Sequence, residues 1–258
     1  PTFEEYPNRL ADDRVVTFIP DNRDFRYGVS DLMAFFEENR VDNLLLINPD
    51  NPTGNFIPLD DLCKLAGWCE AHSVRLILDE SFVDFSEAWA TSSFLCDSYL
   101  EAYPHLVVVK SISKSYGVPG LRLGILASAD QALISSLKRK VSIWNINSFA
   151  EFFMQIFTKY EKDYETACEK FVNVRAEFLK ELNTISYLHP MPTQANFVFC
   201  EVLPPFTAQS VALALLKKHN ILISACGAKK GIEPNRYIRL AIRSTADNRC
   251  LIEALKNL

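Results

Sequence analysis

Several short segments of this chain are apolar at nearly every position, and they alternate with stretches that have helical spacing. A strand that is apolar on both faces must be buried on both, as in a parallel sheet covered by helices. The predicted strands are residues 15–19, 43–47, 74–78, 106–109 and 123–127. The predicted helices between them are residues 30–39, 59–72 and 130–140. This order predicts an α/β domain with a largely parallel sheet.

The second half of the chain has a different pattern. Two long helical segments, residues 149–160 and 163–183, precede a mixture of short strands and helices. The later elements are predicted strands at 196–202, 221–223 and 237–242, a helix at 208–219 and a last helix that ends near Leu258. We therefore predict a large domain of residues 1–160, and a linking helix with a smaller α+β domain in residues 161–258.

Composition excludes several classes of partner. The net charge is −5, and Lys and Arg are scattered, so no basic face is expected for nucleic acid or anionic lipid. The seven cysteines form no C-x-x-C pair, so neither a disulfide framework nor a metal site is expected. No apolar run approaches the roughly 18 residues of a membrane span, and the first residues lack a signal-peptide pattern. We expect a cytoplasmic protein.

Polar residues follow three of the predicted strands. Residues 48–54 read NPDNPTG and lie between a predicted strand and a predicted helix, where an ordinary turn is an equally open reading. The strand at 74–78 ends in Asp79 and Glu80, and a partly desolvated acid there requires a cationic partner. The next strand ends in hydroxyls and Lys114, with Arg122 shortly after, a combination that favours an anionic ligand. In open α/β sheets, ligands bind at this carboxyl edge.

Together these segments resemble the class I/II aminotransferases of the fold-type-I pyridoxal 5'-phosphate (PLP) enzymes. The matching motifs are NPxNPTG at 48–54, an apolar strand ending in DE at 79–80, and SxSKxxGxxGLRxG at 111–124. The resemblance covers essentially the whole chain and is closest to threonine-phosphate decarboxylases, then histidinol-phosphate aminotransferases. It implies PLP as cofactor, a three-layer α/β/α large domain and a smaller C-terminal α+β domain.

The resemblance also assigns roles to single residues. It implies that Lys114 holds PLP as a Schiff base and, once released, moves the α-proton of the substrate. Asp79 is expected beneath the pyridine nitrogen, Asn51 at the phenolic oxygen, and Phe3 against the ring. The residues expected to bind the cofactor phosphate are Ser111, Ser113 and Arg122.

Substrate binding is assigned to the smaller domain. By resemblance, Arg239 grips the substrate carboxylate and Asn196 lies close by. Each has a simpler reading: Arg239 as the partner of a surface acid, Asn196 as a turn residue, and Phe3 as part of a frayed terminus. Residues 144–147 (WNIN) resemble a segment near the dimer interface of the family, and we expect a symmetric homodimer.

Three departures from the family pattern bear on function. The glycine- and serine-rich turn that contributes backbone N–H groups to the cofactor phosphate lies upstream of residues 1–3 in the family, so this sequence alone is expected to bind PLP weakly or not at all. Phe82 replaces a tyrosine that hydrogen-bonds the cofactor. Ser224 stands where relatives place an arginine for the substrate phosphate. The cations that could compensate are Lys229, Lys230 and Arg243.

The sequence therefore predicts a PLP-dependent aminotransferase acting on a small amino acid, phosphorylated or otherwise anionic. Decarboxylation is the alternative, because the same residues serve both reactions and the outcome depends on which bond at the α-carbon is aligned. A second alternative is a catalytically impaired member retained as a dimerisation or regulatory module.

Overall fold

The computed structural model describes residues 2–11, 14–227 and 229–258. The chain forms two compact units, which we describe separately. The parallel-sheet unit comprises residues 27–49 and 57–169. The antiparallel-sheet unit comprises residues 1–26, 50–56 and 170–258.

These units do not follow the single division predicted after residue 160. Residues 1–26 and the loop 50–56 group with the C-terminal half, and helix α6 (Glu161–Leu182) contributes to both units. Chain order cannot show this, because compact units are set by contacts between segments far apart in sequence. As a division into folding domains, the predicted boundary stays a prediction.

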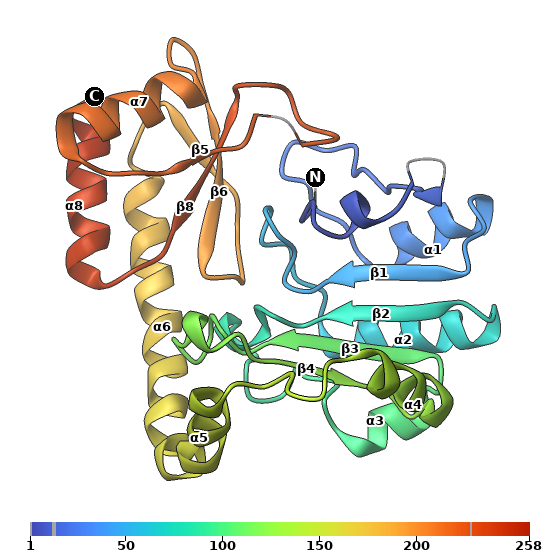
Figure 1. Ribbon diagram of the computed structural model, residues 1–258. Helices are drawn as coiled ribbons and strands as arrows, with labels where there is room; N and C mark the ends of the chain where they lie inside the picture. The colour runs from blue at the N-terminus through green and yellow to red at the C-terminus, as the bar shows by residue number, and fades with distance from the viewer. Residues whose placement is uncertain (1, 12–13, 228) are drawn as a thin grey trace. The chain divides into compact units, whose positions relative to one another are not determined.

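The parallel-sheet unit has four strands in the order β1-β2-β3-β4. The first three are parallel and β4 is antiparallel to β3, as Figure 1 shows. Leu46, Leu78 and Val108 are each at most 5% exposed, so the centres of β1, β2 and β3 are buried as predicted. The apolar run of β4 is not: Ile125 and Leu126 are 42% and 44% exposed. The strands are β1 (Asn43–Ile47), β2 (Arg75–Asp79), β3 (Leu106–Ser111) and β4 (Gly124–Ala127).

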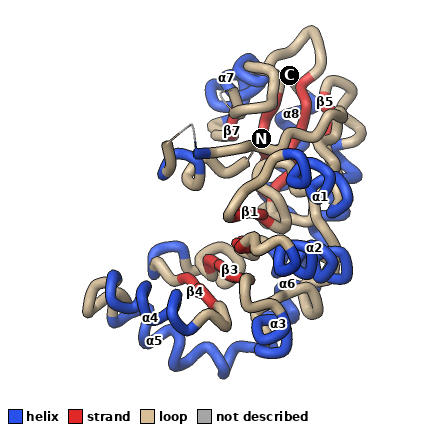
Figure 2. Tube along the Cα trace, turned by 90° about the vertical axis from the view of Figure 1, so that its right-hand side faces the viewer, coloured by secondary structure: helices blue, strands red, loops and turns tan. Residues whose placement is uncertain are grey.

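Helices cover both faces of this sheet, which confirms the predicted three-layer arrangement. In Figures 1 and 2, α1 and α2 lie side by side on one face and α4 lies on the other. Helix α2 begins after Pro58 and carries Asp60 and Asp61 in its first turn, where the helix dipole favours acids. The helices are α1 (Val29–Glu38), α2 (Leu59–Ala71), α3 (Asp97–Ala102), α4 (Gln131–Lys140) and α5 (Ser148–Phe157).

The antiparallel-sheet unit contains the strands and helices of the predicted smaller α+β module. Its strands follow the order β5-β6-β8-β7, and every pairing is antiparallel. All residues of β6 are buried, because one core packs on each side of this strand. The elements are β5 (Leu188–Pro190), β6 (Phe197–Val202), α7 (Ala208–His219), β7 (Ser224–Ala225), β8 (Tyr237–Ala241) and α8 (Thr245–Lys256).

Two predicted strands differ from the structure, and two short elements have no counterpart in the prediction. The predicted strand at 15–19 is wrong: this segment is irregular, and Val16 and Ile19 are 48% and 40% exposed. Its β-branched residues pair with no strand among the described residues, and β propensity acts only where a neighbouring strand exists. The strand predicted at 221–223 is displaced to β7, whereas α3 and β5 were not predicted because both are very short.

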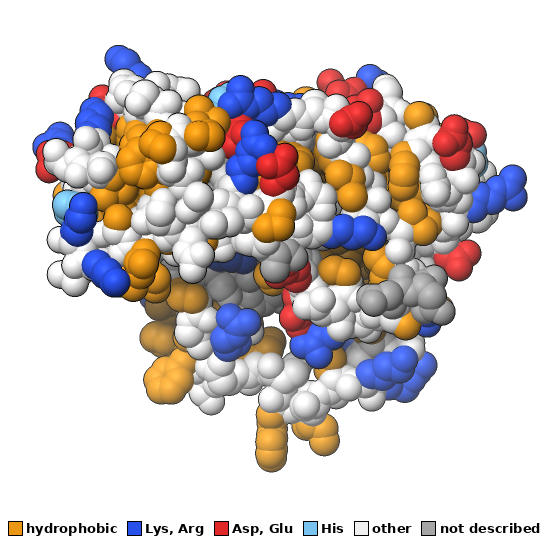
Figure 3. All heavy atoms as spheres, turned by 90° about the horizontal axis from the view of Figure 1, so that it is seen from above, with side chains coloured by type: hydrophobic (Ala, Val, Ile, Leu, Met, Phe, Trp, Pro, Cys, Tyr) orange, Lys and Arg blue, Asp and Glu red, His pale blue; other side chains and the backbone are white. Residues whose placement is uncertain are grey.

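None of the described helices combines the length and the apolar character that crossing a bilayer requires. Within the same part of the chain, no three His, Cys, Asp or Glu side chains gather as ligands for a metal ion. On the face drawn in Figure 3, basic and acidic side chains are interspersed with apolar ones.

Candidate active site

The predicted cofactor residues of the parallel-sheet unit lie at the carboxyl ends of β2 and β3. Asp79 is the last residue of β2 and pairs with Val109 of β3. Ser111 ends β3, and its backbone N–H donates to the Ser81 hydroxyl at 2.9 Å. Because the strands are parallel, both ends meet at one edge of the sheet. The structure thus brings Asp79 and the segment that leads to Lys114 into one corner.

Asp79 is held in place at the end of its strand. It is 7% exposed, and its Oδ1 accepts the backbone N–H of Ser81 at 2.9 Å. A buried carboxylate is stable only when hydrogen bonds or cations compensate for lost hydration. Asp79 can therefore support a protonated ring nitrogen, the role that the sequence motif predicts.

Lys114 lies in the turn that follows β3. Its Nζ is 4.5 Å from the centroid of the Phe82 ring, three residues after Asp79. The turn is closed by a hydrogen bond from the Gly117 N–H to the Lys114 carbonyl, at 3.2 Å, and Gly117 has a φ of +66°. The ring face stabilises the ammonium by a cation–π interaction. Lys114 therefore lies over the ring of Phe82, in the segment that directly follows Asp79.

Phe82 carries a testable consequence for the cofactor. Phe82→Tyr adds a hydroxyl that can donate to the phenolic oxygen of PLP, which favours the deprotonated chromophore. A hydrogen bond to a charged group is worth about 1.5 to 3 kcal/mol, so the midpoint of the pH titration of bound PLP is expected to fall by about 1 to 2 pH units. Absorption spectra of the PLP-loaded protein between pH 5 and about 10 measure it. A midpoint that stays in place contradicts this placement of Phe82, and Phe85→Tyr is the matched control.

The three predicted phosphate ligands differ in what they contact. Ser113 is 5% exposed, and its hydroxyl donates to the Leu123 carbonyl at 3.4 Å. Arg122 is exposed and donates to the Pro119 carbonyl at 3.2 Å. Its φ of +58° lies in the left-handed region, which is uncommon for a non-glycine residue and often marks a functional site. As phosphate ligands, Ser111, Ser113 and Arg122 remain a prediction.

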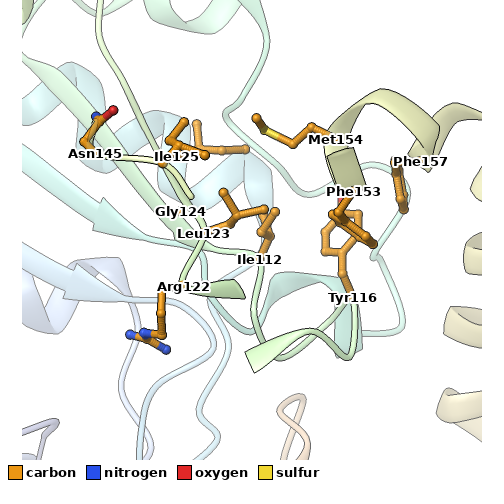
Figure 4. A pocket seen from close by; sticks show the side chains of 11 residues that line it. Ile112, Tyr116, Arg122, Leu123, Gly124, Ile125, Asn145, Phe153, Met154 and Phe157 are labelled. Atoms are coloured by element: carbon orange, nitrogen blue, oxygen red, sulfur yellow. The ribbon is translucent and has the colours of Figure 1, made fainter. Parts of the chain in front are cut away.

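A cavity of about 330 Å³ lies in the same unit but has an apolar lining. Figure 4 shows Leu123, Ile125 and Met154 gathered around it, while the Arg122 side chain points away. Asp79, Ser111, Ser113 and Lys114 are absent from its lining. Of the predicted cofactor residues in this unit, the hollow therefore includes only Arg122 in its lining.

The antiparallel-sheet unit brings together two residues predicted for different tasks. An Arg239 Nη donates to Asn51 Oδ1 at 2.7 Å, and the guanidinium lies 5.0 Å from the Phe197 ring centroid. Because the Asn51 oxygen accepts from Arg239, the amide N–H₂ is left to face another acceptor. Neither residue pairs with a surface acid in the hydrogen bonds that the structure defines for it. The pair suits recognition of two neighbouring anionic oxygens.

The loop that carries Asn51 is fixed by close packing. Gly54 has a φ of +75°, and a Cβ added there would lie 2.0 Å from Thr193 Oγ1. The Gln194 N–H donates to the Gly54 carbonyl at 3.0 Å. Only glycine accommodates both the backbone angle and this approach. The motif read as NPDNPTG is therefore a rigid support for Asn51.

Two predicted residues show no contact that supports their roles. Phe3 is 44% exposed, and its ring meets Tyr6 edge-on with the centroids 6.0 Å apart. Asn196 is half-buried, and its carbonyl accepts the Ile242 N–H at 2.9 Å. Pro1, part of the motif around Phe3, lies outside the described residues. Both roles remain predictions.

Sequence reasoning missed a buried ion pair beneath this corner. Lys110 Nζ lies 2.6 Å from Asp84 Oδ1, and both residues are 6% exposed. Nearby, Glu80 accepts the Ser93 hydroxyl and the Phe94 N–H, and burial raises the pKa of its carboxyl. The lysine inside the apolar run VVVKS could have indicated a buried ion pair. Its partner follows only from the fold.

Comparison with known proteins places the chain in a family. The family model described as "Aminotransferase class I and II" matches residues 1–255. The chain belongs to this family. Its members depend on PLP, so PLP is the cofactor, as predicted. Threonine-phosphate decarboxylases and histidinol-phosphate aminotransferases are among its relatives, in agreement with the sequence motifs.

Three proteins with known names or structures show how similar the chain is to its relatives. The chain is 34% identical to the CMP-5'-(3-aminopropyl)phosphonate synthase of Streptomyces rubellomurinus, covering 100% of this chain and 40% of that protein. It is 31% identical to the L-serine phosphate decarboxylase of Sulfurospirillum multivorans, covering 100% and 66%. A solved decarboxylase from Sulfurospirillum multivorans has a TM-score of 0.90 at 31% identity, covering 100% and 73%. The chain thus spans about two fifths to two thirds of these curated relatives.

Proposed function

We propose that this chain holds PLP through Lys114 and decarboxylates a small amino acid that carries a phosphate or phosphonate group. The observation that carries the cofactor assignment is the Lys114 amine over the ring of Phe82, three residues after the buried Asp79. Relatives of at least 30% identity whose names state a reaction of this kind support the choice of decarboxylation, which was the alternative from sequence. The whole protein's substrate is part of the proposal.

The residues present fit PLP on chemical grounds. Lys114 supplies a primary amine for the aldehyde, and Asp79 supplies a buried carboxylate for the ring nitrogen. Bound PLP withdraws electrons from the α-carbon of the amino acid joined to it. Ser111 and Ser113 offer hydroxyls, and Arg122 a guanidinium, for its phosphate.

Each residue of the chain then has a defined task. Arg239 binds the α-carboxylate of the entering amino acid, and Asn51, which accepts from Arg239, keeps its amide hydrogens for a second oxygen. Asp79 keeps a proton on the ring nitrogen. With its amine free, Lys114 would carry a proton to the α-carbon of the substrate in place of the departing carbon dioxide. The product is the corresponding amine.

Transamination is the second candidate, and it was the first choice from sequence. Histidinol-phosphate aminotransferases among the relatives favour it, including a solved structure at 26% identity with a TM-score of 0.81. In this reaction Lys114 removes the α-proton instead of supplying one. All the residues named above serve both reactions, so only the products distinguish them.

The test compares products. The protein is incubated with PLP and O-phospho-L-serine, O-phospho-L-threonine or a phosphonate amino acid, with and without 2-oxoglutarate. Carbon dioxide and an amine, formed without 2-oxoglutarate, are the expected products. Glutamate together with a keto acid would favour transamination. A protein that stays colourless with PLP and forms neither product would favour the impaired module.

The position of the substrate phosphate is also a proposal. Ser224 lies opposite Arg239 in the β7–β8 register, so the two side chains share one face of the sheet. Lys229 Nζ donates to the Thr2 carbonyl at 3.0 Å, and Arg243 pairs with Asp247 at 3.1 Å. Both cations therefore have other partners, and we place the distal anion near Ser224. Ser224→Arg is expected to change the preference between phosphate and phosphonate substrates in a competition assay.

Arg239 can be tested by its effect on substrate binding. Arg239→Gln removes one charge-assisted hydrogen bond to the carboxylate, worth about 1.5 to 3 kcal/mol, so KM is expected to rise about 10- to 100-fold. Initial rates at increasing substrate concentration measure it. Arg243→Gln is the matched control, because this exposed arginine contacts Asp247 instead. Equal losses in both variants would contradict the assignment.

We further propose that two copies of the chain pair as a homodimer. Ile143 and Trp144 are 95% and 92% exposed, and Phe149 and Phe152 are 79% and 60% exposed. Apolar surface of this extent is typical of interaction sites. It includes part of the WNIN segment, which resembles a region near the family's interface. Sedimentation velocity at micromolar concentration tests this, and a monomer would contradict it.

A further inference from the structure

The turn that carries Lys114 is anchored on both of its sides. Before it, the Lys110–Asp84 ion pair fixes the end of β3, and the Ser111 N–H donates to Ser81. After Lys114, Tyr116 is the first residue with a large side chain. Lys114 itself is exposed, so its position depends on these neighbours.

Tyr116 packs into an aromatic cluster that helices α5 and α6 supply. Its ring stacks on Tyr164 of α6, with centroids 4.4 Å apart and an interplanar angle of 11°. Phe157, at the end of α5, lies 4.7 Å from the Tyr116 ring, and Phe153 lies 6.5 Å away. Figure 4 shows Tyr116 beside Phe153 and Phe157. Stacked aromatic pairs contribute about 0.5 to 1.5 kcal/mol beyond the area they bury.

The hydroxyl of Tyr164 lies in a closed polar region beside the same turn. The Tyr164 hydroxyl and the Ser115 hydroxyl are both fully buried, and Ser115 directly follows Lys114. Burial, and then the negative charge of Asp84, raise the pKa of Tyr164. The phenol therefore stays protonated at neutral pH. The contact by which Tyr164 reaches the turn is therefore its ring, which stacks on Tyr116, the residue after Ser115.

We propose that Tyr164 is a positioning residue for Lys114: its ring holds Tyr116 and so fixes the turn from which the reactive lysine extends. This inference rests on the proposed function for its catalytic meaning, but the packing that it describes is independent of the cofactor. Tyr164 lies 50 residues beyond Lys114 in the sequence and belongs to no motif there. The fold alone makes this contact.

The experiment compares two substitutions that separate ring from hydroxyl. Tyr164→Leu removes the stack, and Tyr164→Phe keeps it. In the PLP-free protein, hydrogen exchange of residues 111–118 is expected to speed up about threefold to tenfold in Tyr164→Leu and to stay within twofold in Tyr164→Phe. In the PLP-loaded protein, the circular dichroism of the PLP band, relative to its absorption, is expected to fall in Tyr164→Leu alone.

A matched control separates positioning from general destabilisation. Phe178→Leu changes a residue of the same helix that is 2% exposed in the core of the antiparallel-sheet unit. It is expected to lower the melting temperature without changing the exchange of residues 111–118 or the PLP signal. Tyr164→Met, which keeps a large apolar side chain, replaces Tyr164→Leu if that variant does not fold.

The outcomes discriminate between the two proposals. Unchanged exchange in Tyr164→Leu, or an equal change in Phe178→Leu, would overturn the positioning role. Loss of the PLP signal in Tyr164→Phe as well would assign the effect to the hydroxyl and overturn the role of the ring. A wild-type protein that binds no PLP at Lys114 would contradict the proposed function. The hydrogen-exchange data would still decide whether Tyr164 holds the turn.

Discussion

Replacing Lys114 with alanine is expected to lower kcat at least about a thousandfold and to leave no PLP attached to the protein after borohydride reduction. The amine is the group that both holds the cofactor and moves the proton at the substrate's α-carbon. No other lysine of the described residues lies over Phe82 in the contacts that the structure defines. Mass spectrometry of peptides from the reduced protein locates the attachment, and stopped assays give kcat.

The control for this variant is Lys140→Ala. Lys140 is an exposed residue at the end of α4 in the same unit. Its replacement is expected to leave both kcat and the attachment of PLP unchanged. Attachment of PLP to a different lysine in the wild-type protein would contradict the assignment. A Lys114→Ala protein that retains more than about a tenth of the activity would contradict the proton-transfer role.

Asp79→Asn is expected to have the second largest effect, a loss of about a hundredfold to ten-thousandfold in kcat. The amide oxygen can still accept the Ser81 N–H that Asp79 Oδ1 accepts at 2.9 Å, so the local fold is retained. What disappears is the negative charge that keeps the ring nitrogen protonated and the ring electron-withdrawing. Steady-state rates measure the loss, and the melting temperature verifies the fold.

Glu80→Gln is the matched control for the loss of a buried acid. Glu80 is the next residue and is 1% exposed. Its carboxylate accepts hydrogen bonds from the Ser93 hydroxyl and the Phe94 N–H, so its role is structural. Its substitution is expected to change stability and to spare kcat. A kcat within tenfold of wild type in Asp79→Asn, or an equal loss in Glu80→Gln, would remove the special role of Asp79.

Several features of the fold followed directly from local patterns in the chain. The strand predicted at 43–47 is β1, and the helix predicted at 208–219 is α7, with the same bounds. These elements have strong periodicity or capping, which depend on neighbouring residues only. The segment 15–19 shows the limit of that reasoning. It has the same β-branched composition as a strand, but no described strand lies beside it to form a ladder.

The candidate site shows the same limit. The motifs identified Asp79 and Lys114, because Asp79 ends a strand and Lys114 follows one, each within a contiguous pattern. The contact between Arg239 and Asn51, 188 residues apart, appears in no local pattern. The same holds for Lys110 with Asp84, where a buried lysine required a buried acid but any of the chain's acids could have supplied it.

The amino-acid sequence by itself determined the family, the cofactor, the order of most strands and helices, and the kinds of side chain that end each strand. It could do so because periodicity and motif spacing are properties of neighbouring residues. Only the tertiary structure decided that Lys114 faces Phe82, that Arg239 bonds Asn51 and that Tyr164 stacks on Tyr116. Such contacts arise when separate elements pack against one another, and many different pairings are compatible with the same local sequence.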